Sequence, residues 1–512
     1  MEQEVKKAKI NKKQKRLIIS LVLCLFSLTL GVVSGIKIAS IDDVEHKQSQ
    51  YDQLVQILNQ SWRSDIYYGN DAEEKALINQ FIGALSTSDS VRLDPYTYLR
   101  KKESSVASKQ TGKLGITLSY FYNYPVIIEE DKDGACYNVL KEGDIVTSLG
   151  KIENDEYKYY SIIDDKTDYS NIFEQVLGMP NDKIMVKVAR FENNILNHLS
   201  YEITLKEASE TKYSYVVDEN IDDTLMVKLT GFTDSNNGTA TQLEAILKKD
   251  KSKNLIIDLR DNGGGDLSSV IDVCDLFLPK NILVTTLEYK DGLRECKTYD
   301  DDVYEYEKIC VLQNENTASA SEILISTLLY YFNDKVTLIG SKSYGKGIAQ
   351  SSVNVLNNQY ILQYTCAKWL RPDNSWIGMT IENQAPTNYF MPTENYNLEK
   401  SNTLKLMEAN NGYIFYKENV EDYLAFNIDK VAYQNQYFFE VYNSLYNKDI
   451  RTDRYFDNSC SEAIKEYQTL KGINVTGTMN QDTFLHFVYD FYCIKSNFSK
   501  LHLDKVIEIV GE

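Results

Sequence analysis

The region from about residue 206 to residue 406 alternates two kinds of hydrophobic pattern. Short β-type runs such as TLMVKL, NLIIDL and KVTLIG are separated by helical runs such as TATQLEAILKK and SEILISTLLYYF. Strands and helices in alternation are typical of a layered α/β architecture, because each helix covers an apolar face of a sheet. We therefore predict an α/β core over residues 206–406.

The regions on either side of this core have different patterns. Residues 37–100 contain two short amphipathic helical patterns after a polar stretch. Residues 101–205 contain short β-type runs separated by turn-rich pieces, which predicts a small, mostly β domain. Residues 407–429 are expected to be a linker, and residues 430–512 return to helical patterns. The predicted fold class is therefore a multidomain α/β plus β protein with a helical C-terminal domain.

The N-terminus has the pattern of a membrane anchor. A basic tail over residues 1–16 precedes an uncharged apolar run at residues 17–36. About 20 apolar residues span the hydrocarbon core of a bilayer, and basic residues favour its cytoplasmic side. We predict a single transmembrane helix that leaves the basic tail in the cytoplasm and places the chain that follows the helix outside the cell membrane. A cleaved signal peptide is the alternative, but the run is longer than usual and no A-x-A cleavage site follows.

Charge and cysteine content narrow the choice of partners. The formal net charge of −19 argues against nucleic acid as a ligand, because a phosphate backbone requires a basic surface. One of the eight cysteines lies in the predicted anchor, and the others are scattered without a CxxC pair. Such an odd set predicts neither a disulfide framework nor a metal site.

Three motifs in the predicted core carry candidate chemistry. NLIIDLRDNGGGDL leads a strand into three glycines at residues 263–265, which expose backbone N–H groups. TASASEI places Ser319 three residues before Glu322, the spacing of a helix capping box. GKGIAQ places Lys346 between two glycines and Gln350 four residues later. Considered one at a time, the three motifs are best interpreted as a tight turn, a helix cap and a solvated lysine.

The absence of histidine from the core restricts the chemistry further. No histidine occurs between His198 and His486, so a Ser-His-Asp triad within this region is excluded. If Ser319 is a nucleophile, another group must take its proton. A lysine can do so when desolvation or neighbouring donors lower its pKa enough to make it neutral.

In this order, the three motifs resemble the C-terminal processing (tail-specific) proteases, serine peptidases that use a Ser-Lys dyad. The resemblance implies that Ser319 is the nucleophile and that Lys346 is the general base. It implies that Gln350 orients and polarises the lysine. It also implies an oxyanion hole made of the backbone N–H groups of Gly264 and Ala320.

The flanking regions resemble two binding modules. The β-rich segment is similar to a PDZ domain, in which amides around Leu114, Gly115 and Ile116 would capture the free C-terminal carboxylate of a substrate. The C-terminal segment resembles a peptidoglycan-binding domain in the stretch AIKEYQTLKGINVTGTMNQDTFLHF. The alternatives are an ordinary surface strand and a small helical accessory domain.

These expectations combine into one hypothesis: a membrane-anchored, extracytoplasmic serine endopeptidase that cleaves proteins with exposed C-terminal tails through an acyl-enzyme. All catalytic groups are supplied by the protein, so no metal or cofactor is expected. Peptidoglycan is a candidate partner, and the oligomeric state is open, with a homodimer as one option. One alternative is an inactive envelope scaffold that uses the PDZ and peptidoglycan-binding domains. Another is a wall hydrolase that cleaves glycan with paired carboxylates.

Overall fold

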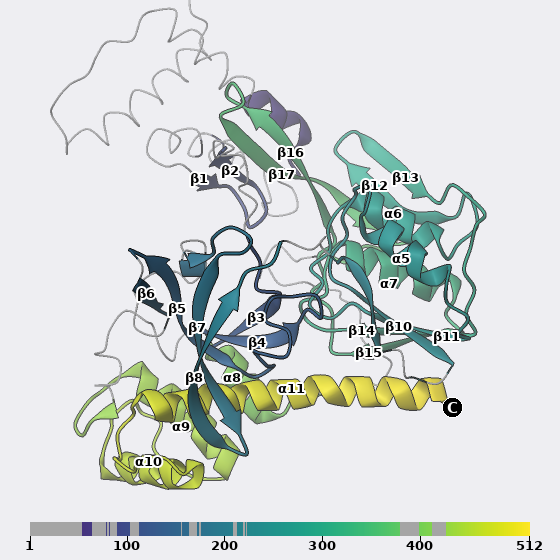
Figure 1. The fold of residues 1–512 in the computed structure, drawn as a ribbon. Coiled ribbons are helices and arrows are strands. Elements are labelled where there is room, and N and C mark those ends of the chain that lie inside the picture. Colours follow the sequence, from purple (N-terminus) through teal and green to yellow (C-terminus); the bar gives the residue numbers. More distant parts are fainter. Residues whose placement is uncertain are drawn as a thin grey trace, which may run out of the picture. The chain divides into compact units, whose positions relative to one another are not determined.

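A computed structural model gives the fold, and its described residues form two compact units (Figure 1). The structure describes residues 54–63, 78, 81, 90–102, 112–154, 156–162, 172–173, 176–207, 212–218, 221, 223–378, 399–411 and 426–511. The first unit takes its residues from 1–104, 212–397 and 510–512. The second takes its residues from 105–211 and 398–509.

The first unit contains a five-stranded sheet in the order β15-β14-β11-β10-β9. Its strands are β9 (Ser214–Asp218), β10 (Thr224–Leu229), β11 (Asn254–Asp258), β14 (Lys308–Gln313) and β15 (Val336–Gly340). β10, β11, β14 and β15 run parallel, and β9 is an antiparallel edge. β10, β11 and β14 are almost wholly buried, as expected for parallel strands that are covered on both faces.

Three helices pack with this sheet in one hydrophobic core. They are α5 (Thr239–Leu247), α6 (Leu267–Asp275) and α7 (Ala320–Tyr331), labelled in Figure 1. Residues 320–328 of α7 are all buried, so this helix lies inside the unit and its start is held firmly. The predicted α/β alternation of this region is confirmed.

A second sheet in the first unit is built from distant parts of the chain. Its strands are β1 (Ser90–Arg92), β2 (Tyr98–Lys101), β12 (Leu283–Tyr289), β13 (Gly292–Lys297), β16 (Ile348–Val355) and β17 (Tyr360–Leu370). β17 pairs with β2, β12 and β16. Residues 54–61 form a helix, and Leu58 and Trp62 pack in one cluster with Leu362 of β17. The described residues before residue 101 therefore fold with the core region.

The second unit combines a six-stranded antiparallel sheet with helices from its C-terminal part. The strands are β3 (Ile116–Phe121), β4 (Tyr124–Glu130), β5 (Ile145–Glu153), β6 (Glu156–Ser161), β7 (Lys183–Glu192) and β8 (Ile195–Thr204). The helices are α8 (Asn402–Ala409), α9 (Tyr433–Tyr446), α10 (Asn458–Lys471) and α11 (Gln481–Gly511). Tyr122 at the β3–β4 turn stacks on Phe487 of α11, with ring centroids 5.2 Å apart. The β part and the helical part thus share one core.

The predicted fold class needs one correction, which concerns the transmembrane helix. None of the helices in the described ranges is long and apolar enough to cross a membrane. α11 is 31 residues long but carries charged residues along its length, from Asp482 to Glu508. Residues 17–36, where that helix was predicted, lie outside the described residues. The fold class is corrected to an α/β fold with a C-terminal helical domain, in whose described residues no helix can cross a membrane.

Candidate active site

The three sequence motifs follow three neighbouring strands of the parallel sheet. The glycine turn follows β11, the Ser319 loop follows β14, and the Lys346 loop follows β15. Because parallel strands end at the same edge of a sheet, these segments meet at the carboxyl edge, where α/β proteins usually bind ligands. The sheet order therefore brings together motifs that are far apart in the sequence.

Ser319 occupies the sharp turn into α7. Its backbone has φ 58° and ψ −116°, a left-handed conformation that costs free energy for any residue with a side chain. Ser319 and Glu322 form the predicted capping box, in which the Ser319 N–H donates to Glu322 Oε2 at 2.8 Å. Ser319 is half-buried, so a substrate can reach its side chain.

The glycine turn is fastened to the Ser319 turn through Asn262, which is fully buried. The Asn262 side chain donates to the Leu229 carbonyl at 2.8 Å, which ties the turn to the end of β10. Its backbone carbonyl accepts from the Ala318 N–H at 3.1 Å and from the Ser321 hydroxyl at 2.9 Å. Ser321 therefore has a structural role beside the candidate nucleophile.

The two predicted oxyanion donors differ in what they contact. The Ala320 N–H donates to no group within the described part of the chain. Gly264 lies directly against the turn, because a Cβ built on it would stand 2.8 Å from Ser319 Cβ and 2.9 Å from the Ala320 nitrogen. However, the Gly264 N–H already donates to Asn262 Oδ1 at 2.9 Å. The Ala320 amide is the more available of the two donors.

The loop that carries Lys346 is held by two tryptophans. Trp369 Nε1 donates to the Lys346 carbonyl at 2.7 Å, and Trp376 Nε1 donates to the Gly347 carbonyl at 2.6 Å. Gly347 admits no side chain, since a Cβ there would lie 1.4 Å from the Ile377 carbonyl oxygen. The backbone of the lysine is therefore fixed, and its side chain is the part that can turn.

The Lys346 ammonium group lies over the ring of Tyr96, 5.0 Å from the ring centroid. Burial lowers the pKa of Lys346 below its ordinary value, and the nearby Glu322 charge opposes this shift. A lowered pKa increases the fraction of neutral amine, the form that can accept a proton. Within the described residues, no hydrogen bond joins Lys346 Nζ to Ser319 Oγ.

Gln350 lies at the start of β16, where the strand register shifts between Ala349 and Gln350. Its side-chain nitrogen is buried and has no hydrogen-bond partner in the described part of the chain. Buried polar atoms are normally paired, so this one is available to a group that enters the site. The predicted contact of Gln350 with the lysine is not made in this structure.

Two contacts of this site were not predicted from the sequence. Glu322 was assigned only to the capping box, although a carboxylate inside an apolar helix is rarely buried without partners, which is a usable signal. Tyr96 comes from the β1–β2 connection, and its backbone N–H donates to Asp94 Oδ1 at 2.8 Å. No local pattern marks a tyrosine so distant in sequence as a neighbour of Lys346.

The predicted tail-binding loop leads into β3 of the second unit. Gly115 has φ +75°, and a Cβ on it would lie 2.3 Å from the Gly134 Cα, so only glycine fits this backbone crossing. The Leu114 carbonyl accepts from the Cys136 N–H at 3.0 Å, and the Gly115 carbonyl accepts from the Asp131 N–H at 2.9 Å. Capture of a substrate carboxylate by Leu114, Gly115 and Ile116 stays a prediction.

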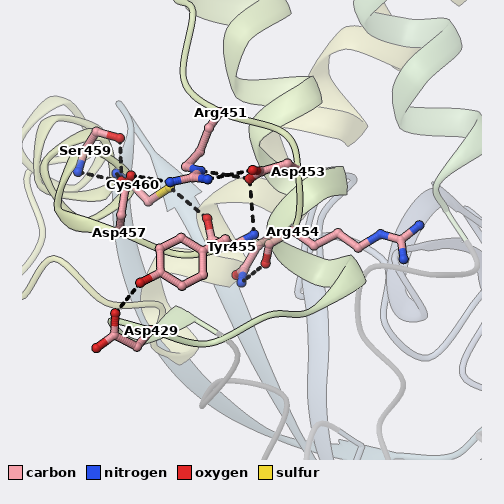
Figure 2. A network of polar contacts seen from close by, with 9 residues as sticks. Asp429, Arg451, Asp453, Arg454, Tyr455, Asp457, Ser459 and Cys460 are labelled. Carbon is pink, nitrogen blue, oxygen red and sulfur yellow. Dashed lines mark hydrogen bonds and ion pairs between the residues drawn. The ribbon is translucent and has the colours of Figure 1, made fainter.

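A polar network shapes the loop before α10 (Figure 2). Arg451 makes a forked contact with Asp453, with distances of 2.8 and 2.6 Å, and reaches Asp457 at 2.7 Å. The Tyr455 hydroxyl donates to Asp429. Because these acidic side chains contact Arg451 or Tyr455, we assign the network a structural role.

A cavity of about 560 Å³ lies against α9 and α10 of the helical part. Its lining combines aromatic and charged side chains, including Tyr442, Tyr446, Lys448, Lys465, Glu466 and Tyr467. The Glu466 carboxylate accepts from the Tyr442 hydroxyl at 3.1 Å and from Lys448 Nζ at 2.8 Å. Tyrosine rings beside charged groups can contact both the flat face of a sugar and a carboxylate.

Neither unit shows a metal site in the ranges described. No group of three or more histidine, cysteine, aspartate or glutamate side chains there could hold a metal ion. The seven cysteines from Cys136 to Cys493 are all unpaired, and burial raises the pKa of the Cys274 thiol to about 12. Burial raises the pKa of the other six thiols as well, so these cysteines are protonated at neutral pH.

Two parts of the chain match protein families. Residues 223–384 match Peptidase family S41, and residues 442–485 match the family described as "Putative peptidoglycan binding domain". Carboxy-terminal processing protease CtpA from Bacillus subtilis is 26% identical over 355 residues, which cover 69% of this chain and 72% of that relative.

Two further proteins are similar to this chain. A "Probable CtpA-like serine protease" from Staphylococcus aureus strain N315 is 28% identical over 284 residues, which cover 54% of this chain and 51% of that relative. The chain therefore spans about half the length of that relative. A solved photosystem II D1 C-terminal processing protease is 17% identical with a TM-score of 0.37, over 76% of this chain and 94% of that one.

Proposed function

We propose that Ser319 and Lys346 form the catalytic dyad of this chain, a serine-type peptidase in which residues 223–384 match Peptidase family S41 and which is similar to carboxy-terminal processing proteases. The observation that carries the proposal is the meeting of the Ser319 turn, the glycine turn and the Lys346 loop at one sheet edge. The lowered pKa of Lys346 supports its role as the base.

In the proposed reaction, neutral Lys346 takes the proton of the Ser319 hydroxyl while Ser319 Oγ attacks the scissile carbonyl. The N–H of Ala320, at the positive end of α7, donates to the oxyanion that develops. Lys346 then passes its proton to the leaving amine, which leaves an acyl-enzyme. Lys346 then takes a proton from water as the water attacks the acyl carbon, the bond from that carbon to Ser319 Oγ breaks, and Lys346 returns the proton to Oγ as the new carboxyl product leaves.

This reaction requires the Lys346 side chain to turn from the Tyr96 ring toward Ser319. The loop backbone does not need to move, because the two indole hydrogen bonds hold its carbonyls. In that second position the side-chain oxygen of Gln350 would accept from the lysine, and the buried amide nitrogen of Gln350 lacks a partner in the described residues. We propose that the dyad forms its hydrogen bond when a substrate occupies the site.

The dyad is tested by cleavage of an unstructured protein with an apolar C-terminal tail. Ser319→Ala and Lys346→Ala should each abolish turnover, whereas Lys342→Ala, an exposed lysine of the same loop, should keep it. Undiminished turnover by either dyad variant would contradict the proposal. An unaltered chain that cleaves no protein would favour the inactive scaffold, and glycan release that survives Ser319→Ala would favour a wall hydrolase.

We further propose that the β part of the second unit captures the C-terminal tail of the substrate. The support is the sharp Gly115 turn before β3, whose neighbouring amides would meet a carboxylate. Removal of the last few residues of the substrate should lower kcat/KM. Equal rates for full-length and shortened substrates would show that tail capture is not needed.

Peptidoglycan binding by the helical part is the second candidate function. The cavity between Tyr446 and Lys465 lies inside the matched residues 442–485 and combines aromatic with charged groups. Because peptidoglycan lies outside the cytoplasmic membrane, this function implies an extracytoplasmic protein. Sedimentation with purified peptidoglycan should retain the full chain and the surface control Lys500→Ala. The variant Tyr446→Ala/Lys465→Ala should lose binding, and full retention of it would exclude this cavity.

A further inference from the structure

Glu322 makes more contacts than a helix cap requires. We propose that Glu322 is a positioning residue, whose buried carboxylate holds the Ser319 turn and the Lys346 loop together and supplies the negative charge beside the lysine. The inference rests on the proposed Ser319–Lys346 dyad. It adds a role for a residue that touches neither the substrate nor the reacting atoms.

Both carboxylate oxygens of Glu322 are used, and each accepts two hydrogen bonds. Oε1 accepts from the Ser343 hydroxyl and from the Gly345 N–H, both at 2.6 Å. Oε2 accepts from the N–H groups of Ser319 and Lys346, both at 2.8 Å. One side chain therefore binds the backbone of the candidate nucleophile and the backbone of the candidate base.

The burial of Glu322 distinguishes it from an ordinary capping residue. Its side chain is fully buried, and none of its four donors is a charged group. A buried carboxylate without an ion pair is strongly destabilising unless its lone pairs are satisfied. A capping box requires only the bond to Ser319, so the other three bonds serve to hold the lysine loop.

The chemistry of these four donors favours a carboxylate over its close relatives. Glutamine presents one acceptor oxygen, and its NH₂ group would face two donors. Aspartate is shorter by one methylene group and cannot reach both segments without a shift of the backbone. Misplacement of a catalytic group by about 1 Å lowers the rate by about 100-fold.

The charge of Glu322 also acts on Lys346. Burial raises the pKa of Glu322 while its hydrogen bonds oppose the shift, and its negative charge raises the pKa of Lys346 against the effect of burial. The Tyr96 ring lies beside the lysine, and the Tyr96 hydroxyl lies 2.9 Å from the Tyr344 hydroxyl. Glu322 is the acidic group whose charge acts on the lysine.

The test is the pH profile of kcat for Glu322→Gln, with Glu305→Gln, an exposed glutamate of the same unit, as the matched control. Lys346 works as a neutral amine, so activity rises with pH through its pKa. Loss of the Glu322 charge lowers that pKa, and the acid limb of the profile should move to lower pH. In addition, kcat should fall about 10- to 100-fold, with KM little changed.

A second variant separates charge from geometry. Glu322→Asp keeps the charge and loses the reach, so kcat should fall while the acid limb stays where it is. If Glu322→Gln does not fold, Ser343→Ala removes one donor to Oε1 and should lower kcat several-fold without a change of KM.

The inference would be overturned if Glu322→Gln showed an unchanged kcat and an unmoved acid limb. If Glu322→Gln does not fold, a wild-type kcat in Ser343→Ala would overturn it. The dyad itself fails separately, if Lys346→Ala stays active.

Discussion

At the scale of single residues, the Ser319 turn depends on the absence of a side chain at Gly264. Ser319 has a positive φ, and Gly264 packs against it with φ +101°. A side chain at position 264 would collide with the Ala318 carbonyl oxygen and with Ser319 Cβ, both at 2.8 Å. The absence of a side chain there lets two backbones meet at the place where the proposed oxyanion forms.

We expect Gly264→Ala to lower kcat at least tenfold and to cost about 1–3 kcal/mol in the free energy of unfolding, because it strains φ and displaces the Ser319 turn. Gly263→Ala is the matched control, since a Cβ on Gly263 meets nothing within 4 Å. Thermal unfolding and cleavage rates of the two variants check this. If Gly264→Ala and Gly263→Ala lost equal amounts of kcat and stability, the close approach of Gly264 to Ser319 would not matter for catalysis or folding.

At the scale of elements, side chains cap the N-terminus of a helix in the candidate site and of another helix in the helical part. α7 begins at the Ser319–Glu322 capping box, and α10 begins at Asp457, whose carboxylate accepts from the N–H groups of Ser459 and Cys460. The Ser459 hydroxyl and Arg451 hold the pKa of Asp457 well below its usual range. Local chemistry thus fixes where these helices begin.

Asp457→Ala should destabilise the helical part by about 1 kcal/mol, a modest loss because the side chain is partly exposed to water. The loss should be largest near neutral pH. Since the pKa of Asp457 is depressed in the folded state, its contribution is present above the unfolded pKa and fades as the pH falls through the folded one. Asp449→Ala, an exposed aspartate before the same helix, is the control. Thermal unfolding of Asp457→Ala and of the unaltered chain at pH 7 and pH 3 measures this effect. A loss of stability that is as large at pH 3 as at pH 7 would contradict the prediction.

At the scale of the whole molecule, each unit joins segments that are distant in sequence. In the second unit, Phe121 and Tyr122 of the hairpin pack on Phe491 of α11, with ring centroids 5.0 Å apart in each pair. His486 of the same helix is buried against Phe191 of β7, 4.7 Å between ring centroids. The β part and the helical part therefore stabilise each other and should unfold together.

His486 should make this unit less stable in mild acid. Burial, together with the charge of Lys471, lowers the pKa of His486 to about 4. The unfolded chain takes up a proton below about pH 6.5, and the folded chain does not until about pH 4, so the free energy of unfolding falls across this window. His486→Phe should lose less stability between pH 7 and pH 4.5. Equal losses in both proteins, measured by thermal melts, would contradict this.

Much of the candidate site could be inferred from local patterns. The serine peptidase predicted from the three ordered motifs is confirmed by the S41 match, and the capping box at Ser319 is present. The contact of Lys346 with Tyr96 and the extra bonds of Glu322 could not be inferred, because they depend on strand order and on packing between distant segments. The predicted fold class was corrected, because no helix among the described residues is long and apolar enough to cross a membrane.

The sequence by itself determined the residue types available for catalysis. Without a histidine between His198 and His486, the base in this region had to be another group, and Lys346 between two glycines was the candidate. Only the tertiary structure decided how these groups meet. The order of β11, β14 and β15 brings the motifs to one edge, and the lysine side chain lies on Tyr96 without a hydrogen bond to Ser319. Local sequence specifies chemistry and helix starts, whereas contacts across a sheet depend on the folding of the whole unit.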